Sequence, residues 1–362
     1  MLKYTFKRIA FAILTLFIIS VFSYCMIATF SQENPFRELA LASKQKDIEG
    51  WVALQEKKHH WDKPVLTQYF IYIKNFFTGD FGWVFKPTSN PFGAEIKTMP
   101  QLFFKPLRWS ILISLPAFIL SAFIGIILGT ISGYKRGTFI DSTINIFVLI
   151  FIALPSFIIA PIAINISIAA GLPSRVFVTD QPLLVIIKSF LSPILVITLG
   201  SLAVYTSYTR NQVITVLTSN YVLIAKTKGL GNIEIFRKYV FRNISIPIFS
   251  LVFPSYIGLL TGSIVVEVYW QLPGTSQVIA KAFPAGERNV VMFSTIFFTF
   301  LSLITEIITD ISYAFLDPRI KYSSKSGKKY SQYVMSYFTR RKIWNDFISN
   351  TETTLERGKG DE

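Results

Sequence analysis

The sequence predicts an all-α polytopic membrane protein with six transmembrane helices, and three observations lead to this prediction. Hydrophobic residues make up 51% of the 362 residues and charged residues only 16%, whereas soluble domains carry about a quarter charged residues. Six apolar stretches approach or exceed the roughly 20 residues that a helix needs to cross a bilayer core. The net charge is +15. The basic residues that produce it flank these stretches and form no basic patch with interleaved aromatic residues, so we expect no nucleic acid partner.

The six stretches define the predicted spans. They cover residues 9–30, 109–134, 142–171, 181–209, 243–266 and 289–316. Lys188 is the only charge in the first five, whereas the sixth contains Glu306 and Asp310. Four prolines in the spans are expected to kink helices and shape a cavity rather than to bind substrate: Pro155, Pro161, Pro193 and Pro254.

The first span could instead belong to a secretory signal peptide, because Lys3, Lys7 and Arg8 precede it. Its uncharged run, 9–30, is longer than the roughly 7–15 apolar residues of a signal peptide. We therefore expect a retained helix. Cys25 lies inside this run and is the only cysteine in the sequence, which predicts neither a disulfide framework nor a cysteine-rich metal site.

Lysine and arginine in short loops predict the orientation, because they favour the cytoplasmic side of a membrane. The segments rich in these residues are 1–8, 135–141, 210–242 and the tail after 316. The loops 172–180 and 267–288 hold few of them. The long segment 31–108 is also rich in cations, but long segments largely escape the rule. The sequence therefore predicts a multi-pass protein of the bacterial plasma membrane with both termini in the cytoplasm.

The spans divide the chain into four regions. They are an N-terminal region with the first helix (1–30), an extracytoplasmic insertion (31–108), a five-helix core with a cytoplasmic loop at 210–242 (109–320), and a cytoplasmic tail (321–362). The tail is rich in Lys, Ser and Tyr and then polar, so we expect it to be partly disordered.

The insertion is predicted to be a small helical subdomain. Residues 37–56 have helix-forming composition, and 75–82 and 90–93 have the composition of turns. His59 and His60 are adjacent, and neighbours do not share a helix face. Because no carboxylate lies at ligand spacing from them, we interpret them as a solvated surface pair and expect no metal.

The loop 210–242 is the most informative segment. It reads as a helix broken at Gly229 and Gly231, in which Ala225 and Gly229 are four residues apart. On a helix, such residues share one face, and their small size would let another surface approach closely. The alternative is an interfacial helix on anionic lipid.

This segment resembles the cytoplasmic loop of ABC-importer permeases, in which an Ala-x-x-x-Gly core inserts into a cleft of the ATPase subunit. More narrowly, it is similar to the B-type permease of the oligopeptide, dipeptide and nickel uptake family. The matching positions are Tyr221, Val222, Ala225, Lys228, Gly229, Leu230, Arg242, Asn243 and Pro247. Asn220 stands where the family usually has Asp, and Asn caps helices nearly as well.

The resemblance extends over nearly all of residues 1–320. Its further motifs are Arg8, Asn34-Pro35-Phe36, Gly79-Asp80-Phe81-Gly82, the turn from Gly133 to Asp141, Leu154-Pro155-Ser156-Phe157, Gly262, Val266-Glu267, Pro273-Gly274, Asp310, Tyr313 and Asp317-Pro318-Arg319. Ser276 and Glu306 depart from the common pattern, which weakens any inference about substrate specificity.

The resemblance implies a type I ABC importer permease fold and a translocation path for short peptides, with nickel or another small solute as the alternative. The implied partners are a second, C-type permease, two ABC ATPase subunits of the D and F types, an extracytoplasmic peptide-binding protein or lipoprotein, and the lipid bilayer. The implied ATPase-coupling residues are Tyr221, Ala225, Lys226, Lys228, Gly229, Leu230 and Gly231.

The chain is not expected to be an enzyme. The nearest fragment to a phosphate-binding loop, Ser326-Gly327-Lys328-Lys329, lacks the upstream Gly and the hydroxyl residue. No catalytic or metal constellation is visible in the sequence either. We therefore expect no cofactor bound by this chain, with ATP and Mg held by the partner ATPase subunits.

Two further groups are candidates for the translocation path or its gate. The first follows the fifth span, where the resemblance implies a gate and a docking surface, whereas the sequence alone also allows an aromatic belt with a turn: Glu267, Tyr269, Trp270, Pro273 and Gly274. The second is Glu306 and Asp310, because carboxylates within a span are costly and usually functional.

Glu306 and Asp310 leave three interpretations open. They could be solvated or paired near the inner surface, they could line the path, or they could form a proton relay because residues four apart share a helix face. The last interpretation would make the chain a proton-coupled secondary transporter. A membrane scaffold or sensor without transport is a further alternative.

Overall fold

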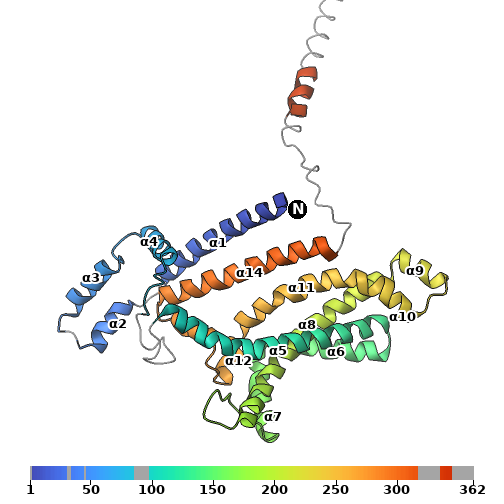
Figure 1. Ribbon diagram of the computed structural model, residues 1–362, viewed down its shortest axis with the longest axis horizontal. Coiled ribbons are helices and arrows are strands. Elements are labelled where there is room, and N and C mark those ends of the chain that lie inside the picture. The colour runs from blue at the N-terminus through green and yellow to red at the C-terminus, as the bar shows by residue number, and fades with distance from the viewer. Residues whose placement is uncertain (1, 31–33, 45, 85–97, 317–334, 345–362) are drawn as a thin grey trace, which may run out of the picture. The chain divides into compact units, whose positions relative to one another are not determined.

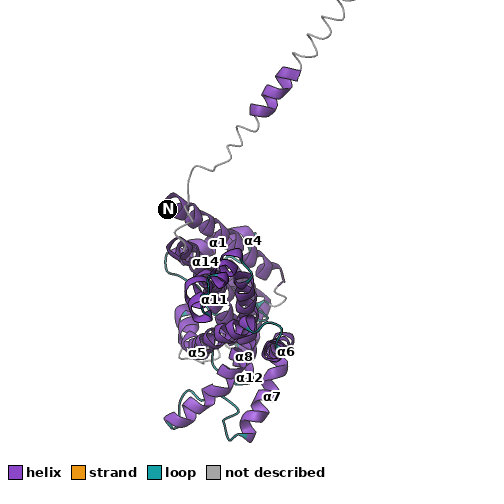
Figure 2. Ribbon diagram, turned by 90° about the vertical axis from the view of Figure 1, so that its right-hand side faces the viewer, coloured by secondary structure: helices purple, strands orange, loops and turns teal. Residues whose placement is uncertain are grey.

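The computed structural model describes residues 2–30, 34–44, 46–84, 98–316 and 335–344. All regular structure in these ranges is helical (Figure 2). Contacts divide the chain into a unit of residues Leu2–Asp317 and a second unit that includes Pro318–Glu362. The described part of the second unit is a helix over 335–344 with exposed apolar side chains such as Trp344. The sequence predicts that the tail, 321–362, is partly disordered, and its residues 321–334 and 345–362 lie outside the described residues.

Five helical stretches in the first unit are long and apolar enough to cross a membrane. They are Thr5–Phe30, Met99–Tyr134, Leu183–Leu217, Asn232–Tyr269 and Arg288–Tyr313, and they correspond to five of the six predicted spans. The main helices in them are α1 (Leu2–Phe30), α5 (Met99–Tyr134), α8 (Leu183–Leu217), α11 (Phe241–Gly262) and α14 (Arg288–Leu316).

The remaining predicted span, 142–171, is not one continuous helix. It consists of α6 (Phe139–Ala153) and α7 (Ser156–Ala169), which are bent by 107° relative to each other. The break lies at Pro155, which has no backbone N–H to donate and disfavours helical geometry in the residue before it. Leu154 is accordingly extended, with φ −87° and ψ 112°. Counted as one span, this broken pair brings the total to six.

Several helices extend beyond the predicted apolar spans. Helix α5 begins at Met99 rather than at residue 109, and α8 ends at Leu217 rather than at residue 209. With 36 residues, α5 is about 54 Å long, which exceeds a hydrocarbon core of roughly 30 Å. Hydropathy marks only the part of a helix that crosses lipid, so the more polar ends are not visible to it.

Helices α5 and α8 form the most extensive helix pair of the described residues. Their close approach depends on Gly125, Gly129 and Gly133 of α5, which are spaced four residues apart. A Cβ atom added to any of them would lie within 2.5–2.8 Å of an α8 atom. Small residues at this spacing let backbones pack closely in membranes, where the hydrophobic effect gives little attraction between helices.

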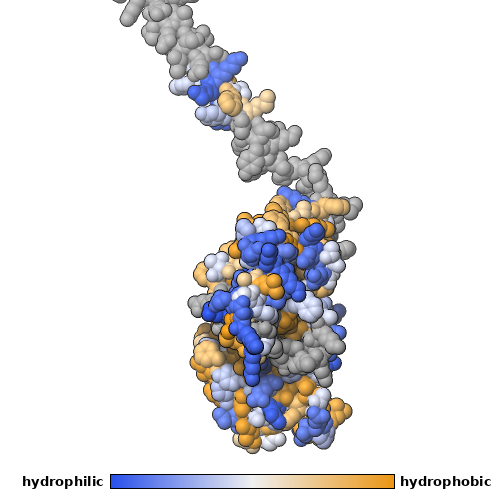
Figure 3. All heavy atoms as spheres, turned by 90° about the vertical axis from the view of Figure 1, so that its left-hand side faces the viewer, coloured by the Kyte–Doolittle hydropathy of each residue, from blue (hydrophilic) through white to orange (hydrophobic). Residues whose placement is uncertain are grey.

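The insertion contains three helices, α2 (Pro35–Ala42), α3 (Ile48–Lys58) and α4 (Val65–Phe77). The helix-forming region predicted over 37–56 is thus two helices. The turn predicted at 75–82 is present, with Gly79 and Gly82 at positive φ, and the turn predicted at 90–93 lies outside the described residues. Helix α4 packs on α1, where the Ser20 and Tyr69 hydroxyls are 2.8 Å apart. Hydrophilic atoms gather over this end in Figure 3.

Different helices gather at the two ends of the first unit (Figure 1). Helices α1 and α14 pack against each other and run antiparallel. The start of α1, the end of α14 and the short helix α9 (Asn220–Thr227) lie at one end, the α9 end. Helices α2–α4 lie at the opposite, insertion end.

Candidate functional site

Helix α9 is anchored to the rest of the chain by Val222 and Ala225. Val222 is fully buried and Ala225 is 2% exposed, and both pack in a cluster with residues of α8 and α11 such as Val213 and Ile244. The prediction that Ala225 and Gly229 share one helix face is therefore wrong. Ala225 points into the core of its own chain, and the helix ends before Gly229.

A glycine is needed where α9 ends. Lys228 caps the helix, and Gly229 follows with φ +76°. Gly229 N donates to Lys226 O at 3.0 Å and Leu230 N donates to Ala225 O at 3.3 Å, the two bonds of a Schellman motif. A side chain at Gly229 would meet no atom of the described chain within 4 Å, so the constraint is the positive φ rather than space. Gly231, also predicted as a break, precedes helix α10 (Asn232–Ile235) with ordinary φ −72°.

The outward side of α9 carries exposed apolar residues. Tyr221, Leu223 and Ile224 of α9 and Ile233 of the following helix α10 are between 42% and 78% exposed, and we call the four the α9 patch. Lys226 and Lys228 are exposed beside them. A hollow of about 380 Å³ adjoins the patch and is lined in part by Arg136, Leu223 and Lys226. The sequence analysis missed Leu223, Ile224 and Ile233, although apolar residues on a short polar-flanked helix are a visible signal.

A buried ion pair holds the elements beside α9 together. Asp141, at the start of α6, is 4% exposed and accepts hydrogen bonds from Arg210 Nε at 2.7 Å and Nη2 at 2.8 Å. Its carboxylate also accepts from the Ser132 hydroxyl and, at 2.9 Å, from Gly137 N. This arrangement ties the end of α5, the start of α6 and the last third of α8 into one assembly, which we call the Asp141 clamp. The sequence analysis assigned Arg210 to the loop 210–242, whereas the residue lies within helix α8.

A second buried carboxyl group organises the insertion end. Glu267 of α12 (Ile264–Tyr269) is fully buried. It accepts hydrogen bonds from the hydroxyls of Ser110 at 2.7 Å and Ser263 at 2.8 Å, and from Gln277 N at 3.3 Å. Gly274 lies directly against it, because an added Cβ there would be 2.3 Å from the carboxyl group. Two of the predicted gate residues, Glu267 and Gly274, therefore lie in contact with each other.

The other predicted gate residues do not form one surface with this pair. Trp270 is fully buried in a cluster with Ile113 and Val196, so it is a core residue rather than part of an aromatic belt. Tyr269 is 39% exposed and Pro273 is half-buried.

The carboxylates of α14 have different surroundings. Asp310 Oδ2 lies 3.0 Å from Arg8 Nε of α1, which fits the interpretation of a paired group. Glu306 is exposed. In the part of the chain that the structure describes, no group of three or more His, Cys, Asp or Glu residues could hold a metal ion.

Comparisons with known proteins agree with this architecture. A family model described as "binding-protein-dependent transport system inner membrane component" matches residues 125–322. The dipeptide transport system permease protein DppB of Lactococcus lactis subsp. cremoris is 30% identical over 323 residues, which are 89% of this chain and 100% of that protein. The oligopeptide transport system permease proteins OppB of Salmonella typhimurium and Haemophilus influenzae are 30% and 29% identical, again over 89% of this chain and 100% of their own length.

The matches confirm the resemblance on which the sequence analysis relied, and the family model accounts for α6 through α14 with the fold expected from it. The apolar helices and the family together make this a multi-pass membrane protein. The chain therefore belongs to the family of binding-protein-dependent transport system inner membrane components.

Proposed function

We propose that this chain is one of two homologous permease subunits of an ATP-driven importer, and that it forms part of the path for short peptides delivered by an extracytoplasmic binding protein. The observation that carries the proposal is that relatives similar over their whole length are named dipeptide or oligopeptide transport permeases. ATP is hydrolysed with Mg in two partner ATPase subunits, and this chain supplies the contact through which their movement reaches the membrane.

The α9 end faces the cytoplasm in this proposal. Lysine and arginine are concentrated in the short segments at that end, including Lys135, Arg136, Lys226 and Lys228, and such residues favour the cytoplasmic side. The insertion then lies outside the cell, where a binding protein would meet it. Both termini of the chain are cytoplasmic.

The α9 patch is the proposed ATPase contact. Its exposed apolar side chains and the adjoining hollow provide a surface that a partner can cover. Because Val222 and Ala225 pack α9 onto α8 and α11, a partner that displaces α9 also displaces these two helices. The Asp141 clamp extends the connection to α5 and α6.

The replacement of Ile224 by Glu tests this contact. Ile224 is 56% exposed, so the change leaves the chain's own packing intact but places a charge in the proposed interface. We expect uptake and copurification of the ATPase subunits to fall at least about tenfold, which corresponds to about 1.4 kcal/mol. The measurements are uptake of a labelled dipeptide in cells and recovery of ATPase subunits with the purified membrane complex.

Two controls accompany this test. Leu54→Glu makes a matched change at a side chain that is 63% exposed on α3, at the opposite end of the unit, and Lys226→Ala removes a charge beside the patch without adding volume. Leu54→Glu should leave ATPase recovery at the wild-type level, and Lys226→Ala, whose side chain lines the hollow beside the patch, should weaken the contact by at most about 1 kcal/mol. Normal recovery and uptake in Ile224→Glu would show that the ATPase subunits bind elsewhere.

A proton-coupled transporter is the competing function, and the surroundings of Asp310 argue against it. Asp310 is paired with Arg8, and Glu306 is exposed. We expect Asp310→Asn and Glu306→Gln to leave uptake dependent on ATP and insensitive to a protonophore at constant cellular ATP. Loss of the Arg8 pair should reduce stability by at most about 1 kcal/mol, since the pair is partly exposed. The proton relay would be favoured if a protonophore abolished uptake by the wild type and these substitutions removed that sensitivity.

A further inference from the structure

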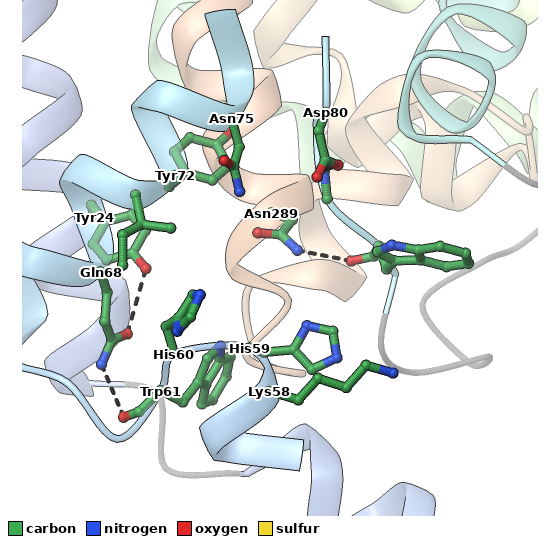
Figure 4. A pocket seen from close by; sticks show the side chains of 13 residues that line it. Tyr24, Lys58, His59, His60, Trp61, Gln68, Tyr72, Asn75, Asp80 and Asn289 are labelled. Atoms are coloured by element: carbon green, nitrogen blue, oxygen red, sulfur yellow. Dashed lines mark hydrogen bonds between the residues drawn. The ribbon is translucent and has the colours of Figure 1, made fainter. Parts of the chain in front are cut away.

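A pocket of about 270 Å³ opens at the insertion end, away from the α9 patch and the Asp141 clamp. It lies between the end of α1, the turn after α3, helix α4, the turn at 80–83 and the start of α14 (Figure 4). Its volume is near the lower limit of the roughly 300–1,000 Å³ of small-molecule sites. It therefore suits a ligand no larger than a short peptide.

Hydrogen bonds fix the walls of the pocket. Gln68 is 8% exposed and donates to the carbonyls of Trp61 at 3.0 Å and Lys63 at 2.7 Å. Its own side-chain oxygen accepts from Arg288 Nη1 at 2.7 Å, and the Arg288 guanidinium lies 3.6 Å from the centre of the Trp61 ring. Asn289 Nδ2 donates to Trp83 O at 3.0 Å. The pocket is thus preorganised rather than a gap between loose side chains.

One buried polar group in the pocket wall is not satisfied. Tyr72 is 7% exposed, and its hydroxyl has no hydrogen-bond partner among the described residues. A buried polar atom without a partner costs roughly 1–3 kcal/mol. Because this hydroxyl is enclosed by the pocket wall, it offers no contact to a ligand in the pocket.

Opposite charges lie on opposite sides of the space. Asp80 is at one side, and Lys58 lies across from it together with His59 (Figure 4). One carboxylate oxygen of Asp80 accepts from Gly82 N at 3.0 Å, which orients the group and leaves the other oxygen for a ligand. Trp61 and Trp83 add aromatic surface to the lining.

The two histidines also belong to this pocket and do not form the solvated pair expected from the sequence. Both are half-buried and line it. His59 stacks on Phe36 with ring centres 5.3 Å apart. Burial, with further contributions from Lys58 and His60, holds the pKa of His59 below its usual value. Near neutral pH its imidazole is therefore mainly uncharged and able to donate one hydrogen bond and accept another.

We propose that this pocket binds a short zwitterionic peptide, with its ammonium group at Asp80 and its carboxylate at Lys58, beside His59. The aromatic rings of Trp61 and Trp83 then cover an apolar side chain of the peptide. The choice of ligand class rests on the proposed function. The pocket is a site on the outer face of the permease itself, in addition to any site in the binding protein.

The test is calorimetric titration of the full-length chain, in lipid nanodiscs and without binding protein, with the dipeptide Ala-Phe. We expect saturable binding of Ala-Phe, and about tenfold weaker binding of both its N-acetylated and its C-amidated form, because each loses one charged contact. Asp80→Asn should weaken binding of Ala-Phe but not of the N-acetylated form. Lys58→Met should weaken binding of Ala-Phe but not of the amide.

Tyr72→Phe removes only the enclosed hydroxyl of the wall and should bind all three ligands like the wild type. Lys57→Met, an exposed neighbour that does not line the pocket, is the matched control and should bind like the wild type. No saturable binding to the wild type, or wild-type affinity for Ala-Phe in both Asp80→Asn and Lys58→Met, would overturn the proposal. If the wild type bound no peptide, but these variants lost binding of the extracytoplasmic binding protein in the same titration, the pocket would be a protein contact instead.

Uptake of Ala-Phe by the complete transporter, measured in parallel, separates this proposal from the proposed function. Uptake without binding to the isolated chain would refute the pocket and leave the importer in place. Binding without any ATP-dependent uptake would retain the pocket and refute the importer.

Discussion

Arg210→Met is expected to uncouple and destabilise the transporter more strongly than any change on the protein surface. The substitution removes both hydrogen bonds of the guanidinium and leaves the Asp141 carboxylate, which is 4% exposed, without its cation. Breaking a buried ion pair from one side costs about 3–5 kcal/mol. The loss should appear as a lower unfolding temperature of the purified complex and as ATP hydrolysis with little peptide uptake.

The uncoupling has a specific structural reason. Arg210 lies in α8, ten residues before the start of α9, whereas Asp141 lies in the first turn of α6, the first helix of the broken pair. Without the clamp, a displacement of α9 still moves α8 through Val213 and Val222, but it loses its connection to the turn between α5 and α6. The ratio of peptide transported to ATP hydrolysed should therefore fall by more than the amount of folded complex does.

A second substitution makes this expectation falsifiable. In the double variant Arg210→Met with Asp141→Asn, no unpaired charge remains buried, so part of the lost stability should return. Arg237→Met, at an exposed cation near the α9 end, should change neither stability nor coupling. If Arg210→Met and Arg237→Met behaved alike, the clamp would have no role in stability or in coupling.

The sequence predicted the fold well because lipid imposes strong demands on it. Long uncharged runs are needed for each crossing, so five spans were recognised and only their polar ends were missed. The sixth shows the limit of this reasoning. Pro155 indicated a kink, but a bend of 107° depends on how α7 packs against α8, which hydropathy does not contain.

The site was predicted less well, for a different reason. Spacing within one segment correctly indicated a short helix and a break, yet it placed Ala225 on the wrong face because the end of the helix was not recognised. Lys228 and Gly229 are in fact a common C-terminal cap pattern. The partners of Asp141 and Glu267 were inaccessible to such reasoning, since Arg210 lies 69 residues from Asp141 and Ser110 lies 157 residues from Glu267.

Gly274→Ala is expected to disrupt the insertion end of the molecule, although it adds a single methyl group. That Cβ would lie 2.3 Å from the Glu267 carboxyl group, far inside any permitted contact. The carboxyl group would have to leave its hydrogen bonds with Ser110, Ser263 and Gln277. Because the group is fully buried, this loss should cost about 3 kcal/mol or more. Thermal unfolding of the purified complex measures the effect.

The double variant identifies the clash as the cause. With Glu267 already shortened to Ala, there is no carboxyl group to displace, so adding Gly274→Ala should cost far less than it does in the wild type. Gly262→Ala is the matched control, because a Cβ there meets nothing within 4 Å, and it should be neutral. Equal costs of Gly274→Ala in the presence and absence of the Glu267 carboxyl group would show that backbone conformation, rather than this contact, explains the glycine. A strong interaction between the two sites would instead establish that Glu267 fixes the turn after α12, and with it the position of the proposed gate.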